Sequence, residues 1–127
     1  MIYTKIRYLP KTLILLKIFM GGLRMNKAQF SIGQVILHNK FNYRGVIFDV
    51  DAEYSGTQEW YDCVAKSKPP KDKPWYHVLV DGQLMTTYVA ERHLQLDENP
   101  QPISHPLTKD YFDSFNNGVY QNYKAQN

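Results

Sequence analysis

The chain has 127 residues, which is enough for one domain with a single core plus extensions. Its only cysteine is Cys63, so an intrachain disulfide is excluded and the cytoplasm is the default location. The net charge of +3 arises from residues 1–24, because the rest of the chain holds ten basic and twelve acidic residues and does not indicate a general phosphate-binding surface.

Residues 1–24 are a basic N-terminal extension without acidic residues. Lys5, Arg7 and Lys11 precede a short apolar run, as at the start of a signal peptide. The run is too short to span a membrane, so no stable membrane insertion is expected. The simplest interpretation places the natural start at Met25, with the extension upstream of it. A basic amphipathic helix that touches a membrane and a secretion signal are the alternatives.

Two β-strands are predicted next. Residues 30–38 mix alternation with β-branched side chains, and Gly33 permits a bulge or bend near the start. Residues 39–43 are a connection, and residues 44–51 form a second strand of good propensity.

Residues 52–73 contain turn residues and many charges, which predicts a long loop with a short helical turn at residues 58–65. Loops of this length are usually functional or mobile.

Residues 74–89 indicate a β-hairpin, because two β-rich runs flank Asp81 and Gly82. This dipeptide tolerates the positive φ angles of a two-residue type I′ turn. Such a turn would pair Leu79 with Leu84 and His77 with Thr86. Both faces of the hairpin are largely apolar or aromatic, so we expect it to be central in the fold.

Residues 91–96 supply a last short strand. Five short strands with one long insertion predict an all-β fold, a small SH3-like bent antiparallel barrel of about five strands. We expect this domain to span residues 25–97. Residues 98–127 are rich in Pro, Asn, Gln and Tyr and are predicted to be a flexible or docking C-terminal tail.

No catalytic constellation, metal site or cofactor is predicted. Asp49, Asp51 and Glu53 alternate at the end of a strand, and a metal site is conceivable there. An exposed charged face is the simpler interpretation. The four histidines lack metal-ligand spacing, and Cys63 has no neighbouring base in the sequence.

Two sets of residues are candidates for binding. His77 is most simply a half-buried strand residue, with a direct ligand contact as the alternative. The aromatic residues beside it are core or rim side chains, or else a stacking platform for a base or an apolar peptide. The candidate aromatic and histidine surface is Trp75, Tyr76, His77 and Tyr88.

The second set is basic. The lysines of the loop at residues 52–73 either form a solvated face or contact phosphates. The candidate DNA or partner contacts are Lys40, Arg44, Lys66, Lys68, Lys71, Lys73 and Arg92.

Four segments together resemble a known bacterial family. They are residues 30–34 (FSIGQ), 43–54 (YRGVIFDVDAEY), 74–80 (PWYHVLV) and 87–94 (TYVAERHL). In this order they resemble the HspQ, or YccV-like, heat-shock family, also called the hemimethylated DNA-binding family. The likeness spans about residues 28–97 and supports a natural start at Met25. The chain departs from the family pattern in residues 55–73, which are Lys-rich where an acidic loop is usual, and in its tail.

The resemblance implies a small cytoplasmic β-barrel protein that is not an enzyme and forms a homo-oligomer, with a trimer as one option. It implies two functions. The first is a quality-control factor that promotes degradation of denatured or specific proteins, such as the replication initiator, by the Lon protease. The alternative is a DNA-binding regulator that recognises hemimethylated origin DNA. The family provides no agreed set of binding residues to transfer to this chain.

Overall fold

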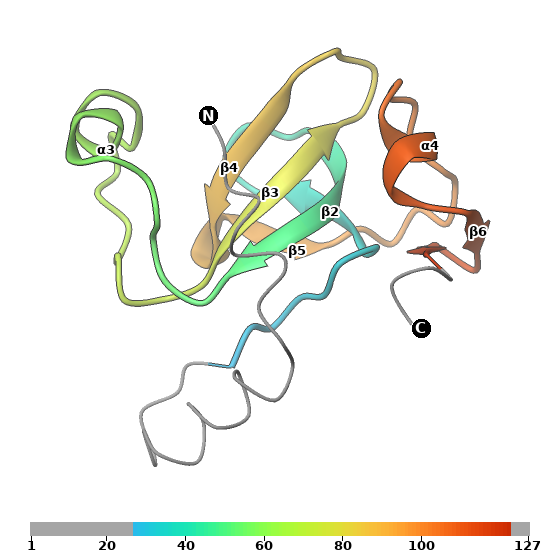
Figure 1. The fold of residues 1–127 in the computed structure, drawn as a ribbon, viewed down its shortest axis with the longest axis horizontal. Coiled ribbons are helices and arrows are strands. Elements are labelled where there is room, and N and C mark those ends of the chain that lie inside the picture. Colours follow the sequence, from blue (N-terminus) through green and yellow to red (C-terminus); the bar gives the residue numbers. More distant parts are fainter. Residues whose placement is uncertain (1–26, 123–127) are drawn as a thin grey trace.

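The computed structural model describes residues 27–122, so the predicted N-terminal extension and the start at Met25 lie outside the described residues. The all-β prediction is confirmed (Figure 1). The main strands are β1 (Val35–His38), β2 (Arg44–Asp51), β3 (Trp75–Val80), β4 (Thr86–Ala90) and β5 (Leu94–Leu96). The other elements are α3 (Gln58–Val64), a 3₁₀ turn (Glu91–His93), α4 (Thr108–Tyr111), β6 (Ser114–Asn116) and β7 (Val119–Gln121).

The five main strands form one antiparallel sheet in the order β4-β3-β2-β1-β5. β2 has the bounds that the sequence predicts. The predicted barrel is not closed, because in the described part of the chain β4 and β5 remain the two edges of this sheet. A 3₁₀ turn carries the chain directly from β4 to β5. β5 has three residues and, within residues 27–122, pairs only with β1.

The predicted register of the β3–β4 hairpin is wrong by two residues. Leu79 pairs with Thr86 and His77 with Tyr88. The connection is longer than a two-residue turn: the Gln83 amide donates to the Val80 carbonyl, and the Val80 amide donates to the Met85 carbonyl. Only Gly82 has a positive φ in this turn, at 75°. A type I′ turn needs two such residues, so Asp81 and Gly82 occupy a type II-like turn instead. A two-residue shift leaves the paired side chains of β3 and β4 on their predicted faces, whereas Leu84 and Met85 lie in the connection.

β1 is shorter than predicted because the chain before it meets the C-terminal segment. Gly33 has a φ of 96°, and a Cβ atom there would lie 2.1 Å from the Tyr120 carbonyl oxygen. The Tyr120 amide donates to the Gly33 carbonyl at 2.8 Å, and Gln34 forms a β-bridge with Val119. Gly33 therefore permits a close backbone approach that a side chain would block.

The sheet is buried on both faces, which explains why all six residues of β3 are buried. One face holds a cluster formed by Ile36, Ile47, Tyr76, Val78, Val89 and Leu94. The opposite face holds Val35, Val46 and Leu79 at one end and Trp75 at the other. Two different segments cover these two ends.

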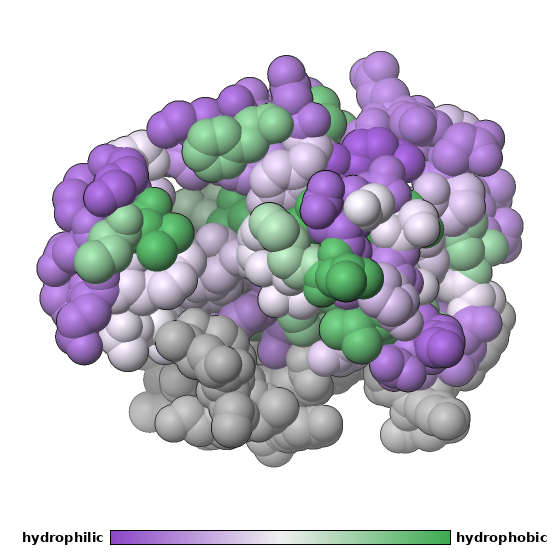
Figure 2. Space-filling view, turned by 90° about the horizontal axis from the view of Figure 1, so that it is seen from above, coloured by the Kyte–Doolittle hydropathy of each residue, from purple (hydrophilic) through white to green (hydrophobic). Residues whose placement is uncertain are grey.

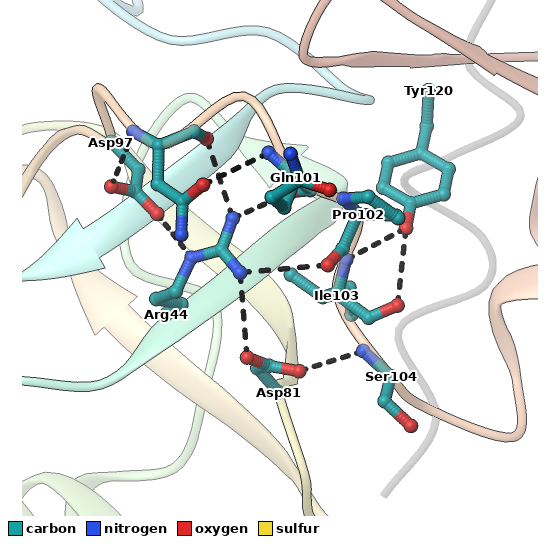
Figure 3. A network of polar contacts seen from close by, with 9 residues as sticks. Arg44, Asp81, Asp97, Gln101, Pro102, Ile103, Ser104 and Tyr120 are labelled. Atoms are coloured by element: carbon teal, nitrogen blue, oxygen red, sulfur yellow. Dashed lines mark hydrogen bonds and ion pairs between the residues drawn. The ribbon is translucent and has the colours of Figure 1, made fainter.

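Residues 98–122 cover the first end. This segment includes α4 and the β6–β7 hairpin, and it buries Ile103, Phe112 and Tyr120 against Val46 and Leu79. Arg44 fastens it to the sheet (Figure 3). The guanidinium pairs with Asp97 and Asp81, and its Nη2 donates to the Gln101 carbonyl at 2.6 Å.

Residues 52–73 cover the second end. Thr57 caps α3 by accepting a hydrogen bond from the Trp60 amide at 3.1 Å. α3 itself contains no fully buried residue, but Trp60, Tyr61 and Tyr54 pack around Trp75. Figure 1 shows α3 beyond one end of the sheet and α4 beyond the opposite end.

No helix within residues 27–122 is long and apolar enough to cross a membrane.

Candidate functional site

A groove of about 1000 Å³ lies beside β4. Its walls include Trp60 and Val64 from α3, Phe41 from the β1–β2 connection, and Met85 from the β3–β4 connection. Phe41, Val64 and Met85 are 67%, 55% and 54% exposed. Figure 2 shows hydrophobic groups bordering a hollow next to the lobe that contains α3. Exposed apolar side chains around a concavity are typical of a binding surface.

Three of the predicted basic contacts lie at this groove, and we call them the basic rim: Lys40, Lys66 and Arg92. Lys40 and Lys66 are exposed and line the groove. Arg92 is exposed, and its Nη2 donates to the carbonyl of Ser67, another lining residue, at 2.6 Å. The basic rim therefore joins residues that are up to 52 positions apart in the sequence.

The other predicted basic contacts lie elsewhere. Arg44 is enclosed by the ion pairs and carbonyls of Figure 3, so its charge is neutralised within the domain. Lys68 lies 3.4 Å from Asp62. The Lys71 ammonium lies 4.4 Å from the centre of the Tyr61 ring and hydrogen-bonds to Gln58. Lys73 is exposed in the loop before β3 and does not line the groove.

The candidate aromatic and histidine surface is mostly interior. Trp75, Tyr76 and His77 are 1%, 0% and 5% exposed. Trp75 donates from its indole nitrogen to the Pro70 carbonyl at 3.0 Å, and the Tyr76 hydroxyl donates to Glu91. Burial and that hydrogen bond raise the pKa of Tyr76. Tyr88 is only partly buried, and with His77 and Trp75 it forms part of the groove wall.

A buried polar network joins Asp51 at the end of β2 to His77 on β3, Tyr88 on β4 and Ser55 in the loop after β2. Asp51 Oδ2 accepts hydrogen bonds from Ser55 Oγ and Tyr88 OH, both at 2.6 Å, and lies 3.0 Å from His77 Nε2. Burial alone would raise the pKa of Asp51, but the hydrogen bonds from His77, Ser55 and Tyr88 outweigh it and lower the pKa. Burial and the bond to Asp51 raise the pKa of Tyr88.

A pair of histidines lies at the basic rim. The rings of His38 and His93 stack, with centres 5.5 Å apart. His38 Nδ1 accepts hydrogen bonds from the amides of Lys40 and Phe41 at 3.2 and 3.0 Å. Burial, reinforced by the nearby His93 and Lys40, lowers the pKa of His38 to about 4. A neutral ring keeps Nδ1 available as an acceptor for both amides.

Two groupings were missed by the sequence interpretation. Asp49 and Asp51 are 2% and 1% exposed, so they are not an exposed charged face, whereas Glu53 is exposed. Asp49 lies directly opposite His77 after a bulge in the β2–β3 pairing. A correct β2–β3 register would have revealed this grouping. The His38–His93 pair spans 55 positions and has no local signal in the sequence.

Comparison with known protein families gives a match over most of the chain. The family model described as "Hemimethylated DNA-binding protein YccV like" matches residues 28–119. The match extends past the last strand of the main sheet and includes α4 and β6. The segment that covers the first end of the sheet is thus part of the family pattern.

Proposed function

The chain belongs to the YccV-like family of hemimethylated DNA-binding proteins, and from this premise we propose that it binds DNA without catalysis. We further propose that the basic rim contacts the DNA backbone and that the groove beside it receives a base edge or methyl group. The family match is the observation that carries the proposal. The positions of Lys40, Lys66 and Arg92 support it.

The charge distribution of the domain leaves few basic side chains available to contact DNA phosphates. Arg44, Lys68 and Lys71, outside the basic rim, have acidic or amide partners. The chain from Met25 onward also has more acidic than basic residues. A few phosphate contacts fix orientation, while specificity requires contacts with base edges. The apolar side chains of Phe41, Val64 and Met85 next to the basic rim fit contact with a methyl group.

The test compares three labelled duplexes of one sequence, unmethylated, hemimethylated and fully methylated, by fluorescence anisotropy across a salt series. We expect the hemimethylated duplex to bind most tightly. Three phosphate contacts predict a slope of about −3 in log K against log salt. Equal affinity for all three duplexes would contradict recognition of hemimethylated sites.

Charge-removing variants locate the surface. Lys40→Gln, Lys66→Gln and Arg92→Gln should each weaken all duplexes and reduce the salt slope by about 1. The matched control is Lys109→Gln, because Lys109 is exposed on α4 and does not line the groove. If the control weakens binding as much as the three variants do, the assignment to the basic rim fails.

A second candidate function is the promotion of degradation by the Lon protease. The observation that favours it is the exposed apolar wall of the groove, since such surfaces also bind apolar segments of unfolded proteins. Degradation of a reporter substrate by purified Lon should accelerate when the protein is added. Phe41→Ser and Met85→Ser should reduce that acceleration, whereas Lys109→Gln should not. Unchanged degradation rates on adding the protein would contradict this function.

Deletion of the C-terminal segment is not a clean test of either function. Removal of residues 99–127 would take Ile103, Phe112 and Tyr120 out of the core. Point variants in the groove avoid this loss. The homo-oligomer stays a prediction, which light scattering of the full chain would check.

A further inference from the structure

We propose that Asp49, Asp51 and His77 form a binding site for one first-row divalent cation, Zn²⁺ or Mn²⁺, at the groove wall formed by Asp49 and His77. Each residue offers one donor atom, and these atoms all lie within 4.8 Å of one another. Two carboxylate oxygens and one imidazole nitrogen are a donor set that such cations accept, and the imidazole disfavours Mg²⁺ and Ca²⁺. The site goes beyond the proposed DNA binding and does not depend on it.

The sheet positions the three side chains together. A bulge between Ile47 and Asp49 brings Asp49 directly opposite His77, and Asp51 follows on the same face, opposite Trp75. The donors therefore project from two hydrogen-bonded central strands of the sheet. A site on strands is held more firmly than one on loops.

All three proposed ligands are buried, which is unusual for two neighbouring carboxylates. Asp49, Asp51 and His77 are 2%, 1% and 5% exposed. Two carboxylates withdrawn from water this completely carry a large desolvation penalty, and a divalent cation offsets it. Within residues 27–122, the Oδ1 atom of Asp51 is buried without a hydrogen-bond partner. A cation bound at this oxygen would satisfy it.

The surroundings match those of a cation site. Ser55 and Tyr88 donate to the other oxygen of Asp51, which holds that carboxylate in place, and ligating carboxylates are usually supported in this way. Asp49 and His77 line the groove, so a cation has an entry path. Phe48 and Tyr88 flank the His77 ring, with ring centres 5.9 and 4.4 Å away.

The experiment uses the full chain without an affinity tag, dialysed against a chelator and titrated with Zn²⁺, Mn²⁺, Mg²⁺ or Ca²⁺ by calorimetry. We expect one equivalent of Zn²⁺ or Mn²⁺ to bind at least tenfold more tightly than Mg²⁺ or Ca²⁺. A hundredfold excess of cation over Kd should raise Tm by roughly 10 °C. Equal affinity for Mg²⁺, or no bound Zn²⁺ and Mn²⁺, overturns the proposal.

Two variants test the residues. Asp49→Asn keeps the shape of the side chain but removes a ligand, so it should weaken cation binding by at least the roughly 10- to 100-fold lost when a residue that supports a ligand is changed. Glu53→Gln removes an exposed carboxylate from the same end of β2 and should bind like the original chain. If Asp49→Asn binds the cation as tightly as Glu53→Gln does, the site is wrongly assigned. The same holds if Glu53→Gln weakens cation binding as much as Asp49→Asn does.

A further measurement needs no variant and so stands even if Asp49→Asn fails to fold. Substoichiometric Mn²⁺ should broaden the NMR signals of the His77 and Tyr88 rings before those of His93 and His105. Broadening that begins at His38 and His93 would place the cation at the basic rim and overturn the proposal.

Discussion

Two segments cover the same face of the sheet, and they do so differently. Residues 98–122 bury Ile103, Phe112 and Tyr120 and are fastened by Arg44. Residues 52–73 pack half-buried aromatic rings around Trp75, and α3 buries none of its residues. The first segment completes the core, whereas the second forms one wall of the groove. We therefore expect the first end of this face to contribute more to stability, and the proposed binding to occur at the other end.

Truncation of a buried ring gives the strongest test of this comparison. Phe112→Ala removes a ring that is 7% exposed and should lower the free energy of unfolding by about 3–5 kcal/mol. Trp60→Ala removes a half-buried ring of the other segment and should cost less than about 2 kcal/mol. Urea unfolding of both variants measures the difference. Equal costs would show that both segments belong to the core.

The next largest effect on stability is expected at Gly33, where the backbone lies close to the Tyr120 carbonyl. Gly33→Ala places a methyl group against the Tyr120 carbonyl at a φ of 96° and should cost about 2–3 kcal/mol. Gly118→Ala is the matched control, since Gly118 also has a positive φ, at 80°, but open space around it. Gly118→Ala should lower the free energy of unfolding by about 1 kcal/mol. Similar Tm values for the two variants would contradict the contact between Gly33 and Tyr120.

The histidine pair at the basic rim predicts a pH dependence. The pKa of His38 is lowered to about 4 in the folded chain, so the unfolded chain, with a pKa of about 6.5, binds protons more readily. This contribution to stability is complete above about pH 6.5 and is lost as the pH falls toward 4. We expect a loss of about 1–2 kcal/mol, reduced from the full shift by solvent screening.

His38→Asn is the variant that checks this assignment. The Asn side-chain oxygen can replace Nδ1 as acceptor for the Lys40 and Phe41 amides but does not titrate. Urea midpoints of this variant should depend less steeply on pH between 6.5 and 4. His93, whose pKa is also lowered by burial, keeps part of the dependence. An unchanged slope would assign the effect to other groups.

The smallest expected effect concerns α3. Thr57→Ala removes the cap of a helix that buries none of its residues. A cap of this kind is worth about 1 kcal/mol, so hydrogen exchange within α3 should accelerate about fivefold. Because this segment is not part of the main core, Tm should change by less than about 2 °C. Thr57→Ser keeps the hydroxyl and should exchange at the original rate; a large Tm drop in Thr57→Ala would contradict the comparison.

Local patterns predicted much of the fold. Alternation and β-branched residues identified β2 with its correct bounds, and the turn residues placed α3 within the long loop. The hairpin register was wrong because a dipeptide that suits a type I′ turn also suits a type II-like turn, with Gly82 as its only residue of positive φ. The family resemblance rested on four segments, and the family match confirms it.

The candidate site was less accessible to prediction. The basic residues looked equivalent in the sequence, yet Arg44 is enclosed by Asp81 and Asp97 whereas Lys40 remains at the groove. Asp49 and Asp51 looked like a solvated face, because acidic residues at a strand end are usually exposed. Both are buried, and Asp51 accepts a hydrogen bond from Tyr88, 37 positions away, a contact that local patterns do not encode.

The sequence by itself determined the all-β class, the bounds of β2 and the family, because these depend on short-range periodicity and on side chains that are neighbours along the chain. It did not predict β6 and β7, which lie in the segment expected to be a tail. Only the tertiary structure decided which charges are neutralised, which aromatic rings are buried, and that Asp49, Asp51 and His77 meet. The physical reason is that burial and electrostatics depend on contacts between segments far apart in the sequence.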